Sequence, residues 1–287
     1  MNVLFIDTDG ELWFNKADEV TANIIRMPYT INGEEFYDDC GRGADYTSFF
    51  QKLRQGGNAT TSALNSVDYI NYFEPFFAKG DDIFYISFGS KMSATFDHLD
   101  NAIKELFVKY PDRHFTRFDT ANISMGAGFM QYYGGKKFNE CKNIEETVAY
   151  LTTLRNQVCT IFVVDDLNHL KKGGRISATT AVFGTLLGIK PVLKITDKGV
   201  IENVDKIKGA KRVITYLANE VKTHITETDK YDIWIMEADC LDEATQLQQA
   251  INELLPNTTV HIQMVGPVIG AHCGPGTIGL IFHADHR

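Results

Sequence analysis

The chain has 287 residues, 44% of them hydrophobic and 23% charged, and this balance is typical of a globular protein with one large or two ordinary domains. The formal net charge of −9 argues against a nucleic-acid-binding protein, which would usually present a basic face. The five cysteines form no CxxC pair, the N-terminus turns acidic too early for a signal peptide, and no apolar run is long enough to span a bilayer. We therefore expect a cytoplasmic protein without disulfides, cofactor or bound metal.

Strand and helix patterns alternate through the first half of the chain. The sequence predicts a hairpin from 24 to 37 around Asn32-Gly33, and a polar loop from 56 to 62. Apolar runs predict strands at 3–6, 82–86 and 114–118. Helices are predicted at 45–53, 65–77 and 144–155, with one more that follows residue 93 and ends at about 108, and another that begins at residue 125. Such alternation favours a doubly wound, mostly parallel sheet, which we assign to an N-terminal α/β domain of residues 1–158.

The second half mixes hairpins with crossovers. A second hairpin is predicted from 191 to 203 around Asp197-Lys-Gly199. The remaining predicted elements are strands at 160–164, 231–236, 260–265 and 277–282, and helices at 177–187, 208–223 and 242–255. This pattern predicts a smaller α+β domain with a mixed sheet, residues 159–287.

Residues 266–276 contain four glycines and two prolines, a density that argues against a regular helix. We predict a loop held between two strands, with His272 at its centre and free backbone N–H groups that favour an anion. The pair His272-Cys273 suggests a cysteine nucleophile with a histidine base. Neighbouring side chains of an extended chain face opposite sides, so the two cannot easily act on each other. Cys273 is therefore interpreted as a small buried hydrophobe. His283, Asp285 and His286 are expected to form a solvated end.

Two further loops are rich in hydroxyl groups, one at Thr60-Thr61-Ser62 and one with Ser87, Ser90 and Ser93. Ligands of open α/β sheets bind at the carboxyl ends of parallel strands, so these loops and His272 together are suited to a carboxylate or a phosphate. The same residue types are also favoured as helix N-caps, and this simpler interpretation stays open.

Asp7-Thr8-Asp9-Gly10 follows a predicted strand and resembles the first motif of haloacid-dehalogenase-type phosphatases, with Asp165-Asp166 as Mg²⁺ ligands. The alternative is a turn that uses aspartate caps. A second ambiguous segment, the loop Lys171-Lys-Gly-Gly-Arg175, fits a phosphate cradle, a contact for an acidic partner, or a helix C-terminus with a glycine stop.

Several motifs occur together in one order along essentially the whole chain: Thr60-Thr-Ser62, Ile83 to Phe96, Asp119 to Gly128, Phe162-Val-Val-Asp-Asp-Leu167 with Lys171 to Ser177, Leu187-Gly-Ile-Lys-Pro-Val-Leu193, and Gly266 to Gly276. This set resembles the DegV family of bacterial fatty-acid-binding proteins. The Lys-Gly-Gly-Arg-Ile-Ser and Gly-Pro-Val-Ile-Gly-x-His motifs are its most specific parts.

The resemblance implies a non-catalytic, two-domain protein that buries one long-chain fatty acid in an enclosed tunnel between its domains. It implies carboxylate contacts from Thr61 and Ser93, with Ser62, Ser90 and His272 close by. It also implies hand-over of the acyl chain to a separate ATP-dependent fatty acid kinase, with Arg175 near the mouth and the kinase contact. We expect the segments 125–130 and 181–187 to line the tunnel. The enzymatic alternative is a Mg²⁺-dependent phosphatase that uses Asp7 and Asp9.

The sequence also departs from the family pattern. The family usually opens on Thr-Asp-Ser-Thr, where this chain has Asp7-Thr-Asp-Gly10. Ala63-Leu64 replaces a common Gln-Pro, Lys91 replaces a glycine, and Cys273 stands where threonine is common. These changes affect the predicted ligand site directly, so the ligand itself is not fixed by the resemblance.

Overall fold

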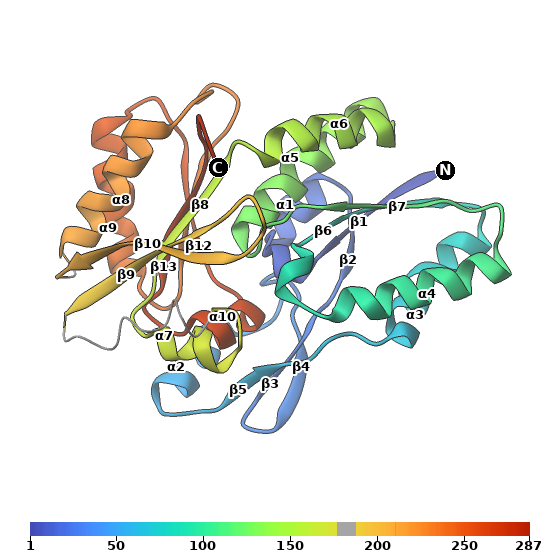
Figure 1. The fold of residues 1–287 in the computed structure, drawn as a ribbon, viewed down its shortest axis with the longest axis horizontal. Helices are drawn as coiled ribbons and strands as arrows, with labels where there is room; N and C mark the ends of the chain where they lie inside the picture. The colour runs from blue at the N-terminus through green and yellow to red at the C-terminus, as the bar shows by residue number, and fades with distance from the viewer. Residues whose placement is uncertain (177–187, 210) are drawn as a thin grey trace.

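Three β-sheets organise the chain (Figure 1). The computed structural model describes residues 1–176, 188–209 and 211–287, so the helix predicted at 177–187 lies outside the described residues. A four-stranded parallel sheet and a separate six-stranded mixed sheet confirm the predicted α/β fold class.

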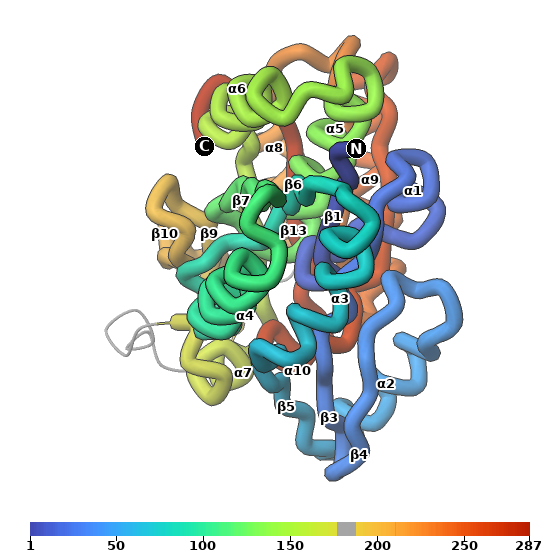
Figure 2. The backbone as a smooth tube through the Cα atoms, turned by 90° about the vertical axis from the view of Figure 1, so that its right-hand side faces the viewer, coloured from blue at the N-terminus to red at the C-terminus, as the bar shows by residue number. Residues whose placement is uncertain are grey.

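The parallel sheet has the strand order β2-β1-β6-β7. Its central strands are apolar runs buried on both faces, as expected where helices cover both sides. Helices α3 and α4 lie on one face and α5 with α6 on the other (Figure 2). The elements are β1 (Asn2–Asp7), α1 (Phe14–Glu19), β2 (Asn23–Ile25), α3 (Ser66–Ala78), β6 (Asp82–Ser87), α4 (Thr95–Lys109), β7 (Phe115–Asp119), α5 (Met125–Cys141) and α6 (Ile144–Arg155).

The mixed sheet has the order β10-β9-β8-β13-β11-β12, with β11 and β12 as its parallel pair. Helices α8 and α9 cover one face, while α5 packs against β8 and β13, so α5 touches both sheets. Its elements are β8 (Val158–Val163), β9 (Ile189–Ile195), β10 (Ile201–Lys208), α8 (Lys211–His224), β11 (Ile233–Glu237), α9 (Leu241–Leu254), β12 (Val260–Met264) and β13 (Ile278–His283).

A small third sheet has the strand order β4-β3-β5. The sequence predicted its hairpin but not its third strand. The hairpin of β3 (Pro28–Ile31) and β4 (Glu34–Tyr37) is confirmed, and Asn32 and Gly33 have the positive φ of 53° and 88° that its turn requires. The predicted loop at 56–62 is wrong in part, because β5 (Ala59–Thr61) pairs with β3. Two β-branched threonines and the open edge of β3 outweigh the polar composition of this segment.

Two short helices correct the loop predictions. Residues Pro267–Cys273 form α10, because a proline in the first turn has no N–H to lose and Gly274 ends the helix with φ 73°. Residues Leu167–Lys172 form α7, which Gly173 follows, so the helix C-terminus with a glycine stop is the alternative that holds for Lys171 and Lys172. Helix α2 (Tyr46–Arg54) packs against α10.

The strands of the parallel sheet all precede residue 120, and those of the mixed sheet all follow residue 157. A division of the chain into domains at 158/159 stays a prediction. Among the described residues, no helix combines the length and the apolar character needed to cross a bilayer.

Candidate functional site

A cavity of about 210 Å³ is lined from both large sheets and from α10. The turns after β1 and β6 contribute Asp9 and Phe88, and the mixed sheet contributes Thr160, Phe162 and Met236. Most of the wall is apolar, and its polar side chains are Asp9, Thr61, Ser62, Ser93, Thr95, Ser124, Thr160, Arg175 and His272.

Thr61 and His272 form one polar wall of this cavity. Thr61 ends β5, and its Oγ1 lies 2.8 Å from Nε2 of His272 on α10. Burial, helped by the charge of Arg175, lowers the pKa of His272 to about 4. The imidazole is therefore neutral at neutral pH and offers one donor and one acceptor. Its buried Nδ1 has no partner among the described residues.

Ser93 and Ser62 line the same cavity. The Ser93 hydroxyl oxygen accepts the N–H of Thr95 at 3.2 Å, which leaves its hydroxyl hydrogen for another acceptor. Ser62 is exposed. Ser90 does not line the cavity, and its N–H points to the carboxylate of Asp119 at 3.3 Å. Lys91 is exposed to solvent.

Arg175 connects the cavity to a second, more polar pocket. Its Nε donates to the carbonyl of Met92 at 3.1 Å, and a second guanidinium nitrogen donates to the carbonyl of Gly173. The second pocket, of about 400 Å³, is lined by His169 and Lys172 and shares Thr61, Arg175 and His272 with the first. These three residues thus separate an apolar interior from a basic outer pocket.

Four acidic side chains are buried beside the cavity: Asp7, Asp9, Glu11 and Asp38. Asp7 accepts hydrogen bonds from Gly10 N–H at 3.0 Å, Phe88 N–H at 2.9 Å and the Tyr85 hydroxyl at 2.9 Å. Burial raises the pKa of Asp7 to about 6. Its carboxyl group therefore braces the ends of β1 and β6 and is poorly placed to attack a phosphate.

The four aspartates of the phosphatase hypothesis do not assemble into a metal site among the described residues. Asp165 is exposed and pairs with Lys190 of β9, whereas Asp7 and Asp9 are buried at the end of β1. Asp166 instead caps α7, where its carboxylate accepts the N–H of Asn168 at 2.9 Å.

The family model described as "Uncharacterised protein, DegV family" matches residues 6–285. The chain belongs to the DegV family. A DegV domain-containing protein of Clostridium perfringens is 34% identical over 285 residues, which span 99% of this chain and 98% of that protein.

Two solved DegV structures share the fold. The fatty-acid-binding DegV proteins of Thermus thermophilus and Streptococcus agalactiae each have a TM-score of 0.84 and 24% identity to this chain. The first match covers 99% of both chains, and the second covers 100% of this chain and 99% of the other. The recognition of a DegV protein from its motifs is thereby confirmed.

In this DegV chain the fold brings Thr61, Ser62, Ser93, His272 and Arg175 to one cavity. The expectation for residues 125–130 is wrong, because the wall uses the preceding Ile123 and Ser124, and residues 181–187 lie outside the described residues. The prediction also missed Thr160 and the cavity position of Asp9. A hydroxyl residue inside the apolar run 158–164 was the available signal for Thr160.

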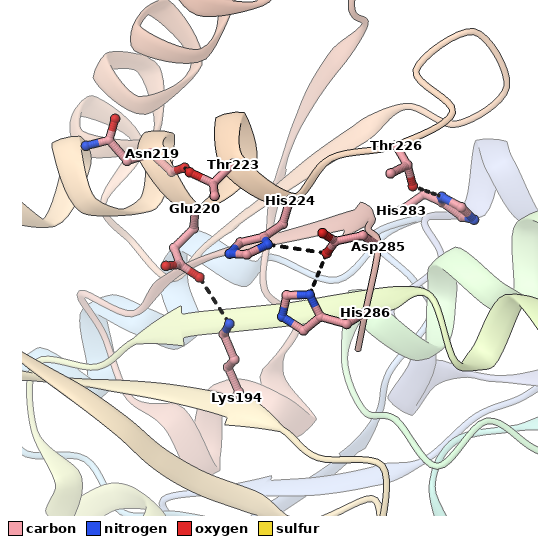
Figure 3. A network of polar contacts seen from close by, with 9 residues as sticks. All are labelled: Lys194, Asn219, Glu220, Thr223, His224, Thr226, His283, Asp285 and His286. Carbon is pink, nitrogen blue, oxygen red and sulfur yellow. Dashed lines mark hydrogen bonds and ion pairs between the residues drawn. The ribbon is translucent and has the colours of Figure 1, made fainter.

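The C-terminal residues His283, Asp285 and His286 are not among the cavity-lining residues and make polar contacts with Thr226 and His224 (Figure 3). His283 is buried, not solvated: its ring stacks on Tyr231, with centroids 4.4 Å apart, and its Nδ1 lies 2.8 Å from the Thr226 hydroxyl. Asp285 and His286 are exposed and approach His224 at the end of α8, with ligand atoms within 4.8 Å of one another. Such a set can meet a metal ion, but Asp285 already lies 3.3 Å from Nδ1 of His224 and 2.5 Å from Nδ1 of His286. We assign no ion to it.

Proposed function

We propose that this DegV protein binds one long-chain fatty acid in the cavity and presents it to a separate fatty acid kinase. Thr61 and Ser93 hold the carboxylate, with Ser62 and His272 close by. The observation that carries the proposal is the Thr61–His272 pair at the edge of an apolar cavity, with the Ser93 hydroxyl in the same wall.

The energetics of this arrangement suit a fatty acid. Each buried CH₂ contributes about 0.8 kcal/mol, so an enclosed apolar cavity favours an acyl chain. A buried carboxylate is costly unless it accepts hydrogen bonds, and hydroxyl and imidazole N–H groups supply them without adding a second charge. The positive charge of Arg175 in the same wall favours the ionised acid further.

The outer pocket supports the hand-over to a kinase. A carboxylate at Thr61 and His272 stands at the boundary between the two pockets. A phosphoryl donor approaching from outside meets Lys172 and Arg175 there, and cations of this kind stabilise transferring phosphoryl groups. The acyl chain then stays buried while its carboxylate reacts, and the lipid lies between an N-terminal domain of 1–158 and a C-terminal domain of 159–287.

Native mass spectrometry tests the proposal directly. The purified protein is measured folded and then denatured, before and after incubation with long-chain fatty acids. We expect a mass excess equal to one fatty acid that disappears on denaturation, because the acid is held without a covalent bond. The mass of the released acid identifies its chain length and unsaturation.

A protein that stays free of lipid, both as purified and after incubation, would contradict the proposal. Incubation with a fatty alcohol of the same length is the matched control. It keeps the apolar part and lacks the carboxylate, so it should be retained far less well if the polar wall recognises the acid.

A further inference from the structure

Besides Nδ1 of His272, two polar atoms in the cavity wall have no hydrogen-bond partner among the described residues: Oδ1 of Asp9 and Oγ1 of Thr160. Both residues are buried, with exposed fractions of 8% for Asp9 and 3% for Thr160. An unpaired polar atom in a buried place is costly, so native proteins rarely leave one without a partner or a ligand.

The two residues meet the same short segment at the start of α5. The N–H of Ser124 donates to the carbonyl of Asp9 at 2.9 Å, and a methyl group on Gly126 would lie 2.3 Å from the Thr160 hydroxyl oxygen. Ser124 itself lines the cavity, but its hydroxyl is taken by Glu11. Asp9 and Thr160 thus come from elements different from those that carry Thr61 and His272.

The contrast with the other buried acids shows that Asp9 is unusual. Asp7, Glu11 and Asp38 all accept hydrogen bonds, from Tyr85, Ser124 and Tyr46 respectively. None of these three lines the cavity, whereas Asp9 does. The unsatisfied carboxyl group is therefore the one that a ligand can reach.

We propose that the preferred ligand is a hydroxylated fatty acid, whose chain hydroxyl group is recognised by Asp9 and Thr160. This inference rests on the proposed fatty-acid-binding function and specifies its substrate class. A hydroxyl group both donates and accepts, so it can donate to Oδ1 of Asp9 and accept from the hydroxyl of Thr160.

A cationic ligand group fits these two residues less well. Burial, with the nearby charges of Asp7 and Asp38, raises the pKa of Asp9 well above its usual range, which favours the neutral acid. Thr160 is neutral too. A neutral pair of this kind matches a neutral hydroxyl group better than an ammonium group.

The test compares octadecanoic acid with a set of monohydroxyoctadecanoic acids whose hydroxyl group is moved along the chain. Binding to delipidated protein is measured by displacement of a fluorescent fatty acid. At least one positional isomer should bind roughly tenfold to a hundredfold more tightly than octadecanoic acid, because only that isomer satisfies the two unpaired atoms. In Thr160→Val, a change close to isosteric, this preference should fall to within about threefold.

Thr147→Val is the matched control, since Thr147 is buried in α6 with its hydroxyl bonded to the carbonyl of Asn143 at 2.7 Å. It should keep the preference. Equal binding of octadecanoic acid and every isomer would overturn the hydroxyl inference and leave fatty-acid binding standing. A preference unchanged in both Thr160→Val and Asp9→Leu would overturn the assignment of these residues. No binding of any acid would overturn the proposed function together with the inference.

Discussion

At the scale of single residues, the neutral imidazole of His272 is the feature that most constrains the site. A charged histidine at this place would be repelled by the positive charge of Arg175. Because burial lowers the pKa of His272 to about 4, the ring instead holds Thr61 in place through their 2.8 Å contact and stays uncharged above about pH 5. In the proposed complex, recognition of the carboxylate then depends on hydroxyl groups whose positions are fixed.

Replacing either hydroxyl group should therefore weaken fatty-acid uptake. For Thr61→Ala and for Ser93→Ala we expect binding about ten- to a hundredfold weaker, because each change removes a hydrogen bond to a charged group. The measurement is displacement of a fluorescent fatty acid at neutral pH. Ser90→Ala is the control, since Ser90 lies outside the cavity lining and should bind as the parent protein does. Normal uptake by both site variants would remove Thr61 and Ser93 from the carboxylate site.

At the scale of elements, α10 depends on glycine for its contact with α2. A methyl group on Gly270 would lie 2.8 Å from the ring of Phe50 and 2.9 Å from that of Phe49, closer than such atoms can approach. The glycine lets the two helices pack tightly, and this packing sets the position of His272 two residues later.

Gly270→Ala should therefore displace α10 and weaken the site. Overpacking costs about 1–3 kcal/mol, and the better helix propensity of alanine offsets up to about 1 kcal/mol, so we expect a net loss of about 1 kcal/mol. Urea unfolding followed by circular dichroism gives the stability, and fatty-acid displacement gives the affinity, which should fall as well. Gly43→Ala, where the nearest atom to an added methyl group is 3.4 Å away, should change neither. An unchanged affinity in Gly270→Ala would show that α10 can shift without moving His272.

The large elements were predictable from the sequence, because their apolar runs and amphipathic patterns indicate a strand or a helix without knowledge of how the sheets are arranged. The short elements were not. Helix α10 contains two residues that usually argue against helices, and it forms because Pro267 falls in its first turn and Gly270 meets Phe49 and Phe50. Strand β5 forms because β3 offers it an edge, which no local pattern reveals. The Thr61–His272 contact joins residues 211 positions apart, so it depends on both of these elements.

For the site, the motif resemblance named Thr61, Ser62, Ser93, His272 and Arg175, and all five line one cavity, while their contact with a carboxylate stays a prediction. It did not place Ser90, because a side chain in a short 3-10 turn can face either way. The hydroxyl of Thr160 marks it as unusual in β8, but this strand is buried on both faces and the fold alone decides which face meets the cavity.

At the scale of the whole molecule, the buried acids should make stability depend on pH. Burial raises the pKa of Asp38 from 3.8 to about 6. The folded protein therefore binds a proton more tightly than the unfolded chain, so the stabilisation is fully present below about pH 4 and is lost as the pH rises through about 6.

Asp38→Asn isolates this effect. The amide oxygen can still accept from the Tyr46 hydroxyl and the Cys40 N–H, which both contact Oδ1 of Asp38 at 2.5 Å and 3.2 Å. We expect the variant to gain stability relative to the parent as the pH rises from about 4 to about 7, on the order of 1.4 kcal/mol per unit of pKa difference. Urea unfolding at both pH values provides the measurement. A difference between the two proteins that does not change with pH would contradict this account.

The polar residues of the cavity wall come from different parts of the chain, and this has an evolutionary consequence. One group lies on β5, the turn before α4, and α10, while the other lies on the turn after β1, the start of α5, and β8. Substitutions in the second group change no residue that lines the outer pocket. Related genes can therefore diverge in the second group without changing the outer pocket, because selection acts on the two groups separately.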